Sequence, residues 1–325
     1  MPKNRLDREA QRHLAAARKA LSRGDLTHAA AHTGDALLAA PALPEAHELI
    51  ARLAEHPEGG RDLYRLDPPL ALATVLARAH ILACDKDFDR ALDLLCKVQE
   101  YTPATAWADV LWVTDPATAS AVSVQTVTSL AGHLLELIRR IEATGSLESL
   151  RRAMAPYLRL VRNTIAVHPD NANLLGLAGY LYRRYDLAEA ADYASRADRL
   201  NPSLATAIGL GYIYKDMGCI EEALTAWQRA VGYDPGFLPI YDDIADLLLD
   251  TDRLEEARGY AERALAIEQD YVYARSVILV VQFRQTREET YLDALMALYK
   301  AQPDGSREQG CVGSAIQRTG MKTAE

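Results

Sequence analysis

The sequence has few cysteines, and the four that it has are far apart. They stand at positions 84, 96, 219 and 311 of a chain of 325 residues. The sequence contains no CxxC pair and no short cluster of histidine and cysteine, which are the arrangements typical of zinc knuckles and disulfide frameworks. We therefore predict neither kind of site and expect the four thiols to be reduced.

Runs of basic residues are also missing. The chain carries 36 lysine and arginine residues against 45 aspartate and glutamate residues, which gives a formal net charge of -9. Binding to DNA or RNA needs clustered positive charge, because the phosphates must be neutralised. We therefore expect no nucleic-acid partner.

No segment is suited to be a signal sequence or a membrane span. The first twenty residues are charged, and no apolar stretch follows them as it would in a secretory signal. Residues 116–135 have the length of a span and almost no charge. However, they contain too many serine, threonine and glutamine side chains for a hydrocarbon core. We expect a cytoplasmic protein without a membrane partner.

Phenylalanine and tryptophan are scarce, with three of each, whereas tyrosine occurs 16 times. Tyrosine suits half-buried positions, where the ring packs and the hydroxyl reaches water. Its heavy use is typical of an architecture with much surface per residue. A chain of this length could form about two ordinary domains or one continuous repeat array.

An internal repeat of 33 to 34 residues fills much of the C-terminal half. The aligned segments are 171–203, 204–236 and 238–270. Ala190, Ala223 and Ala257 occupy one register position in them, 33 and 34 residues apart. In the middle segment, Gly218 is expected to end a first helix and Pro235 to stop a second one. Each segment therefore predicts two amphipathic helices joined by a tight turn.

This pattern resembles the tetratricopeptide repeat (TPR) family. The matching residues are Leu177, Ala178, Ala190, Ala197 and Pro202, then Leu210, Gly211, Tyr214, Ala223 and Pro235, then Ile244, Ala245, Leu248, Ala257 and Ala264. The resemblance implies an all-α fold, a right-handed superhelical α-solenoid of helix-turn-helix units. The alanine- and arginine-rich composition also resembles that of proteins from high-GC actinobacteria, which implies a bacterial source.

The repeat pattern predicts four segments along the chain. Residues 5–103 form N-terminal TPR-like repeats, of which one is shortened where proline and glycine break the helix at 54–69. Residues 104–170 form an irregular connection and a degenerate helical pair. Residues 171–303 form a C-terminal TPR array that ends in a degenerate capping repeat. Residues 304–325 are polar and lack a helical period, so a disordered tail is expected.

In the TPR family the first helix of each unit lines a concave groove. The resemblance implies that a peptide or protein partner is bound there by Tyr182, Arg183, Tyr212, Lys215, Asp242, Asp246 and Phe283. Tyrosines would pack against the partner and charges would fix its register. The alternative is that these are ordinary solvated positions of a superhelix.

The sharpest single feature is a row of aspartates in the segment YDDIADLLLD. Asp242, Asp246 and Asp250 stand at i, i+4 and i+8 of one predicted helix, and Asp243 is adjacent. We call these four residues the acidic row. Like charges at this spacing repel one another unless a cation, a basic side chain or solvent lies opposite. The sequence leaves open which of these lies opposite the row.

The string DDIAD also resembles the DDxxD motif of class I terpene synthases and prenyl diphosphate synthases, in which aspartates hold magnesium on a diphosphate. That resemblance would imply a Mg2+ site at Asp242, Asp243 and Asp246. Lys215, Arg183 and Arg184 would then face the diphosphate. No second magnesium motif of the NSE type is visible, and the repeat register already explains this helix.

Two further candidates are weaker. The string DKDFD at 85–89 resembles the start of a calcium loop, but Arg90 replaces the required glycine. It is better interpreted as a turn in which Asp87 caps the next helix. His80 and Cys84 lie one helical turn apart, but two ligands do not make a metal site, and a core or groove role is favoured.

The leading hypothesis is a non-enzymatic TPR scaffold that needs no cofactor and binds a protein or peptide segment in its concave groove. No GxSxG, glycine-rich phosphate loop or HExxH is present, and no catalytic residue is identified. The alternative is an enzyme or biosynthetic accessory that uses the groove as a small-molecule pocket. It would be a Mg2+-dependent lyase or transferase acting on a prenyl diphosphate at the DDxxD motif.

Overall fold

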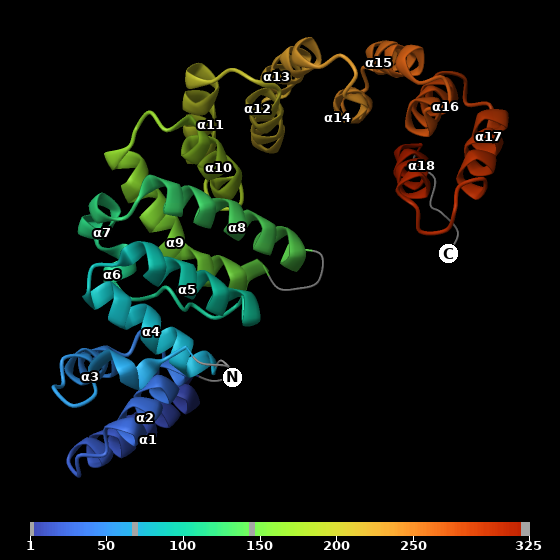
Figure 1. Ribbon diagram of the computed structural model, residues 1–325. Helices are drawn as coiled ribbons and strands as arrows, with labels where there is room; N and C mark the ends of the chain where they lie inside the picture. Colours follow the sequence, from blue (N-terminus) through green and yellow to red (C-terminus); the bar gives the residue numbers. More distant parts are fainter. Residues whose placement is uncertain (1–2, 67–70, 143–146, 320–325) are drawn as a thin grey trace. The chain divides into compact units, whose positions relative to one another are not determined.

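The computed structural model describes residues 3–66, 71–142 and 147–319 (Figure 1). These residues form eighteen α-helices, one short 3-10 helix and no strand. The predictions of an all-α fold and of paired helices are confirmed. The chain divides into two compact units between Leu200 and Asn201. None of the helices in the described ranges combines the length and the apolar character that a bilayer span requires.

The first unit begins with the predicted N-terminal repeats. Its first helices are α1 (Lys3–Leu21), α2 (Leu26–Ala39), α3 (Pro44–Ala54), the 3-10 helix η1 (Gly60–Tyr64), α4 (Leu72–Cys84) and α5 (Phe88–Tyr101). The shortened repeat is the pair of α3 and η1. Asp87 caps α5 as predicted, because its side chain accepts a hydrogen bond from Arg90 N at 3.3 Å.

The rest of the first unit contains two short helices and two longer pairs. They are α6 (Leu111–Thr114), α7 (Pro116–Ala121), α8 (Val124–Glu142), α9 (Leu147–Val167), α10 (Ala172–Tyr182) and α11 (Leu187–Leu200). The stretch predicted to be irregular holds only α6 and α7. The degenerate pair is formed by α8 and α9.

The division between the units differs from the predicted one. The sequence places a break between residues 170 and 171, whereas the structure places it after Leu200. The reason is that α10 packs against α8 and α9 as well as against its partner α11. The hydroxyl of Tyr182 on α10 also donates a 2.8 Å hydrogen bond to the carbonyl of Leu158 on α9. The first strongly repetitive hairpin therefore completes the first unit.

The second unit consists of three helical hairpins and a final helix. Its helices are α12 (Leu204–Met217), α13 (Ile220–Tyr233), α14 (Leu238–Asp250), α15 (Leu254–Ile267), α16 (Val272–Thr286), α17 (Glu289–Lys300) and α18 (Arg307–Arg318). Ser203 and Thr206 form a capping box at the start of α12. Gly218 ends α12 as predicted, with a φ of 76° that few other residues adopt easily.

The core of the second unit runs between the hairpins. Trp227 on α13 belongs to this core, and its side chain is fully buried against α12. Gly211 on α12 allows this contact, because a Cβ at that position would lie only 2.0 Å from Trp227 Nε1. The small residues of the repeat therefore set how closely the two helices of a hairpin approach.

The disordered tail predicted for residues 304–325 is wrong for the described part, because 307–318 form α18. Ser306 caps this helix by accepting a 3.0 Å hydrogen bond from Gln309 N. Val312, Ala315 and Ile316 bury one face of it, and α18 lies beside α16 and α17 (Figure 1). The burial of this apolar face stabilises the helix. Residues 320–325 lie outside the described ranges.

Candidate functional site

The acidic row lies on α14, and three of its carboxylates face tyrosine hydroxyls from neighbouring helices. Tyr212 lies on α12, Tyr271 is the residue directly before α16, and Tyr273 lies on α16. The hydrogen bonds run from Tyr212 to Asp243, from Tyr271 to Asp242 and from Tyr273 to Asp246. Each of these three carboxylates therefore accepts a hydrogen bond from its own neutral donor, which stabilises its charged form and partly offsets the repulsion within the row.

A basic side chain lies opposite the row: Arg318, the last residue of α18. Its Nη2 lies 3.1 Å from Asp246 Oδ2, and its Nε lies 2.9 Å from Asp250 Oδ1. The Arg318 and Asp246 side chains are 22% and 24% exposed, so this ion pair is partly shielded from water. Arg318 was not predicted from the sequence, because residues 304–325 were expected to form a disordered tail.

Partial burial shifts the protonation of the row. Burial raises the pKa of Asp242 to about 7; the hydrogen bond from Tyr271 opposes this shift, and Asp243 adds to it. Burial also raises the pKa of Asp246, and the hydrogen bond from Tyr273 and the charge of Arg318 counteract it. Asp242 therefore changes its charge near neutral pH, a property common at functional sites.

A small pocket of about 130 Å³ adjoins the row, between the start of α16 and α18. Tyr271, Tyr273, Arg307 and Cys311 are among its lining residues. Pockets for drug-sized ligands usually reach about 300 Å³ or more, so this one fits a side chain or a few waters. Burial, with the charge of Asp242, raises the pKa of the Cys311 thiol, which therefore lacks the thiolate character of a nucleophile.

Two other predicted residues of the second unit have different environments. Lys215 is half-buried, with its Nζ 5.9 Å from the ring centroid of Trp227. Phe283 is 8% exposed, and the guanidinium of Arg287 lies 5.8 Å from its ring centroid. Lys215 is thus accessible in part, whereas Phe283 belongs to the core and does not line a surface.

Tyr182 and Arg183 belong to the first unit. Tyr182 is only 3% exposed, because it packs on Tyr193 and its hydroxyl is bonded to α9. Its burial differs from the groove-lining position that the resemblance implies. Arg183 is the C-cap residue of α10 and is half-buried.

The arrangement of the row does not favour the magnesium site suggested by the DDxxD motif. Binding of a magnesium ion would need the carboxylate oxygens of Asp242, Asp243 and Asp246 to converge on one point. Instead, each of the three carboxylates faces a different tyrosine hydroxyl. Within the described ranges, the group of three possible ligands whose donor atoms lie within 4.8 Å of one another is His13, His32 and Asp35. The aspartates of the row form no such group.

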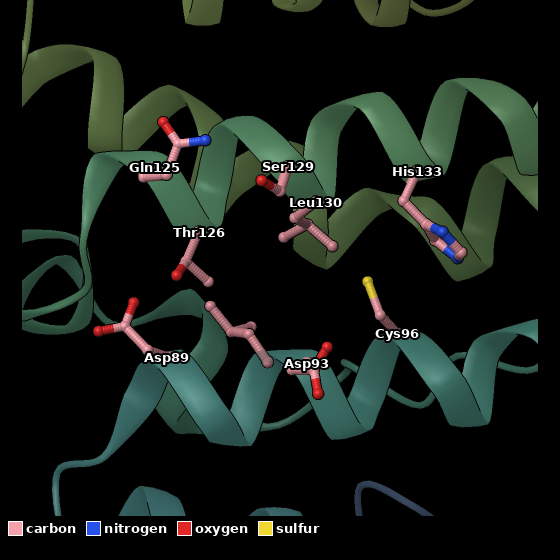
Figure 2. A pocket seen from close by; sticks show the side chains of 9 residues that line it. Asp89, Asp93, Cys96, Gln125, Thr126, Ser129, Leu130 and His133 are labelled. Atoms are coloured by element: carbon pink, nitrogen blue, oxygen red, sulfur yellow. The ribbon is translucent and has the colours of Figure 1, made fainter.

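A larger pocket, of about 400 Å³, lies in the first unit between α5 and α8. Figure 2 shows Asp89, Asp93 and Cys96 on α5 facing side chains of α8 that include His133. Burial raises the pKa of Cys96 to about 12, with smaller contributions from nearby carboxylates, so its thiol is not activated. Asp89 is engaged by hydrogen bonds of 3.1 and 2.8 Å from Ser123 N and Oγ. This pocket was not predicted from the sequence, because its residues belong to two different repeats.

His80 is a core residue, which agrees with the interpretation favoured from the sequence. It is 2% exposed, and Trp112 Nε1 donates a 3.0 Å hydrogen bond to its Nδ1. Burial, with the nearby His47, lowers the pKa of His80 well below its ordinary value. Cys84 is exposed.

No family model matches the chain, and no curated protein matches its sequence. Solved structures with a similar fold exist at low sequence identity. YrrB, described as a TPR protein with an unusual peptide-binding site, is 17% identical, with 69% of this chain and 97% of that chain covered and a TM-score of 0.43. The pilus biogenesis factor PilW is 14% identical, with 74% of this chain and 97% of that chain covered and a TM-score of 0.45. A tetratricopeptide repeat protein from Parabacteroides merdae is 12% identical, with 97% of this chain and 100% of that chain covered and a TM-score of 0.41. These likenesses concern the arrangement of helices; the assignment to helix-pair repeats rests on the period and packing of this chain.

Proposed function

We propose that this protein is a non-enzymatic interaction protein whose second unit binds an arginine-bearing segment of a partner protein on the acidic row. The observation that carries the proposal is the position of α18. This helix, part of the same chain, packs on α16 and α17, and Arg318 at its end reaches Asp246 and Asp250 on α14. A surface that accepts such a helix within the chain is complementary to a similar segment from a partner.

The chemistry of the row suits recognition of a guanidinium group. A planar guanidinium can donate to two carboxylates at once, and such charge-assisted bonds are stronger than neutral ones. The tyrosines hold the carboxylates in place before a ligand arrives, which lowers the ordering cost of binding. The apolar side of α18, formed by Val312, Ala315 and Ile316, supplies the remaining contact area. A partner segment would need the same combination of an apolar stripe and an arginine.

The two cysteines that line the pockets give no support to an enzymatic role as nucleophiles. A nucleophilic cysteine needs a lowered pKa, whereas those of Cys96 and Cys311 are raised. The near-neutral pKa of Asp242 is consistent with binding that depends on pH. The Asp242 carboxyl is neutral under mildly acidic conditions and negatively charged under mildly basic conditions.

The test uses the full-length protein and a fluorescently labelled peptide of residues 304–319. In the wild type the tethered α18 competes with the peptide at an effective concentration of about millimolar, so little peptide should bind. Arg318→Ala weakens the internal competitor, and we expect peptide binding to increase by about tenfold or more. Gln317→Ala, at an exposed neighbouring position of α18, serves as the matched control and should behave as the wild type.

A second variant connects the binding to the row. In the Arg318→Ala background, Asp246→Asn should reduce peptide binding, because it removes one of the two carboxylates that receive the guanidinium. The proposal is wrong if the peptide binds the Arg318→Ala protein no better than the wild type. It is also wrong if Asp246→Asn leaves that binding unchanged.

A further inference from the structure

A cluster of two histidines and one aspartate lies between the first two helices of the chain, far in sequence from the acidic row. His13 is on α1, whereas His32 and Asp35 are on α2, three residues apart. Each offers one donor atom, and the three atoms lie within 4.8 Å of one another. The three side chains are about one third exposed, at 30%, 38% and 44%. The cluster therefore lies at the surface of the helix pair, within reach of an ion from solvent after a small movement of the His32 ring.

The distances are too long for hydrogen bonds and close to those of a coordination sphere. His13 Nδ1 lies 3.5 Å from Asp35 Oδ2, and His32 Nδ1 lies 4.0 Å from the same oxygen. Hydrogen bonds between nitrogen and oxygen are about 2.7 to 3.2 Å long. Ligands at about 2.0 to 2.1 Å from a tetrahedral Zn2+ are separated by about 3.3 Å. Small rotations of the half-exposed rings would bring all three atoms to that separation.

The state of His32 is a second, independent observation. Its Nδ1 is shielded from water and has no hydrogen-bond partner, although it faces the carboxylate. A shielded polar atom without a partner is unfavourable, and such atoms call for an explanation. The chain also provides a contrast one turn earlier on α2. There, His28 Nδ1 and Asp25 Oδ2 are 2.8 Å apart and form an ordinary histidine–aspartate pair.

We propose that His13, His32 and Asp35 bind a divalent transition-metal ion such as Zn2+. Two imidazole nitrogens and one carboxylate oxygen are a ligand set that suits this ion, and water would complete the tetrahedron. Both histidines bind through Nδ1, so their Nε2 atoms carry the protons. The ion joins α1 to α2, and α1 packs mainly on α2. It therefore fastens the first helix of the chain to the rest of the first unit, independently of the acidic row.

The experiment measures zinc affinity of the full-length, tag-free protein by competition with a chromophoric chelator at pH 7.5. We expect one Zn2+ per chain. His32→Gln and Asp35→Asn should each weaken binding by more than the roughly 10- to 100-fold that loss of an outer-shell partner causes. The matched control His28→Gln changes a histidine of the same helix that is paired with Asp25, and should leave the affinity unchanged.

Hydrogen exchange supplies a readout that locates the ion. Zinc should slow amide exchange in α1 and α2 of the wild type and of His28→Gln, but not of His32→Gln. Circular dichroism of each variant establishes that the helices are intact, which is expected because the substituted side chains are partly exposed. The proposal is overturned if the wild type binds no Zn2+ at micromolar concentration. It is equally overturned if His32→Gln and Asp35→Asn retain full affinity, since the ion would then be bound elsewhere, for example by cysteines.

Discussion

The contact between Gly211 and Trp227 allows a stability prediction with a defined sign. A methyl group added at Gly211 would lie 2.0 Å from Trp227 Nε1 and 2.2 Å from its Cδ1, well inside van der Waals contact. Trp227 is fully buried, so the indole cannot move without opening the hairpin of α12 and α13. Gly211→Ala should therefore destabilise the second unit, although alanine is the better helix former.

The magnitude follows from two opposing effects. Overpacking of a filled core costs about 1 to 3 kcal/mol. Replacing glycine by alanine within a helix gains up to about 1 kcal/mol. Because the 2.0 Å contact is severe, the overpacking cost should lie in the upper part of that range, about 2 to 3 kcal/mol, and we expect Gly211→Ala to lower the free energy of unfolding by about 1 to 2 kcal/mol. Gly232→Ala on α13 is the matched control, because no atom lies within 4 Å of its added methyl group. That control should be stabilising by about 0.5 to 1 kcal/mol.

The neighbouring repeats explain why the glycine is needed and sharpen the test. At the two register positions of Gly211 and Trp227, both flanking hairpins carry alanine pairs, Ala178 with Ala194 and Ala245 with Ala261. The double variant Gly211→Ala, Trp227→Ala reproduces that pair. Trp227→Ala alone should cost about 3 to 5 kcal/mol. In its background, however, Gly211→Ala should become neutral or stabilising.

The assay is urea unfolding followed by circular dichroism, with hydrogen exchange resolved on α12 and α13 to assign the change to the second unit. The sign of the Gly211→Ala effect should reverse between the wild-type and Trp227→Ala backgrounds. Equal effects in both backgrounds, or stabilisation by Gly211→Ala in the wild type, would refute the steric argument.

Three further predictions concern titration and helix capping. Burial lowers the folded-state pKa of His80 below its ordinary value of 6.5. Below pH 6.5 the unfolded chain therefore binds a proton at His80 that the folded chain does not bind. The first unit has its full stability above pH 6.5 and loses stability as the pH falls below that value. Urea midpoints at pH 7.5 and 5.5 measure this, and His80→Phe should reduce the difference. Burial raises the pKa of Asp242 from 3.8 to about 7, so the folded state retains the proton and its contribution to stability is lost as the pH rises through that range. Asp242→Asn should therefore stabilise the second unit more at pH 8 than at pH 4, and an equal effect at both values would contradict the assigned burial. Ser306→Ala removes the cap of α18 and should cost about 1 kcal/mol, seen as faster amide exchange confined to α18.

The paired helices could be predicted from the sequence because their signals are local. Gly218 and Asp87 mark helix ends by backbone conformation and by a side-chain cap, and both act within a few residues. Small residues recurring at 33 to 34 positions then identify which helices pair. These features depend on neighbours in sequence, so periodicity alone was sufficient for most of the repeats.

The composition of the candidate site could be predicted only in part. The acidic row and the repulsion within it could be predicted from the sequence. A basic side chain, a cation and solvent all remained open as the group opposite the row, because Arg318 is 68 residues beyond Asp250. The helix that carries it does not continue the repeat period. The sequence nevertheless contains two local signals for this helix. Ser306 stands three residues before Gln309 as a capping residue, and an apolar stripe that includes Val312 follows. A search for capping residues over 304–319 would have predicted α18.

The predicted groove residues Tyr182 and Phe283 show a different limitation. A register position says which side of a helix a residue is on, but burial depends on the helices that pack there. Tyr182 is covered because α9 approaches α10, and Phe283 is nearly covered within the second unit. Neither contact follows from the repeat alone.

The most direct measurement of the central claim compares two peptides of residues 304–319, one with Arg318 and one with alanine in its place. Both are titrated into the full-length Arg318→Ala protein. Charge-assisted hydrogen bonds contribute about 1.5 to 3 kcal/mol, so the arginine peptide should bind about tenfold to a hundredfold more tightly than the alanine peptide. Equal affinities would contradict the claim that the acidic row is a binding face for an arginine-bearing segment.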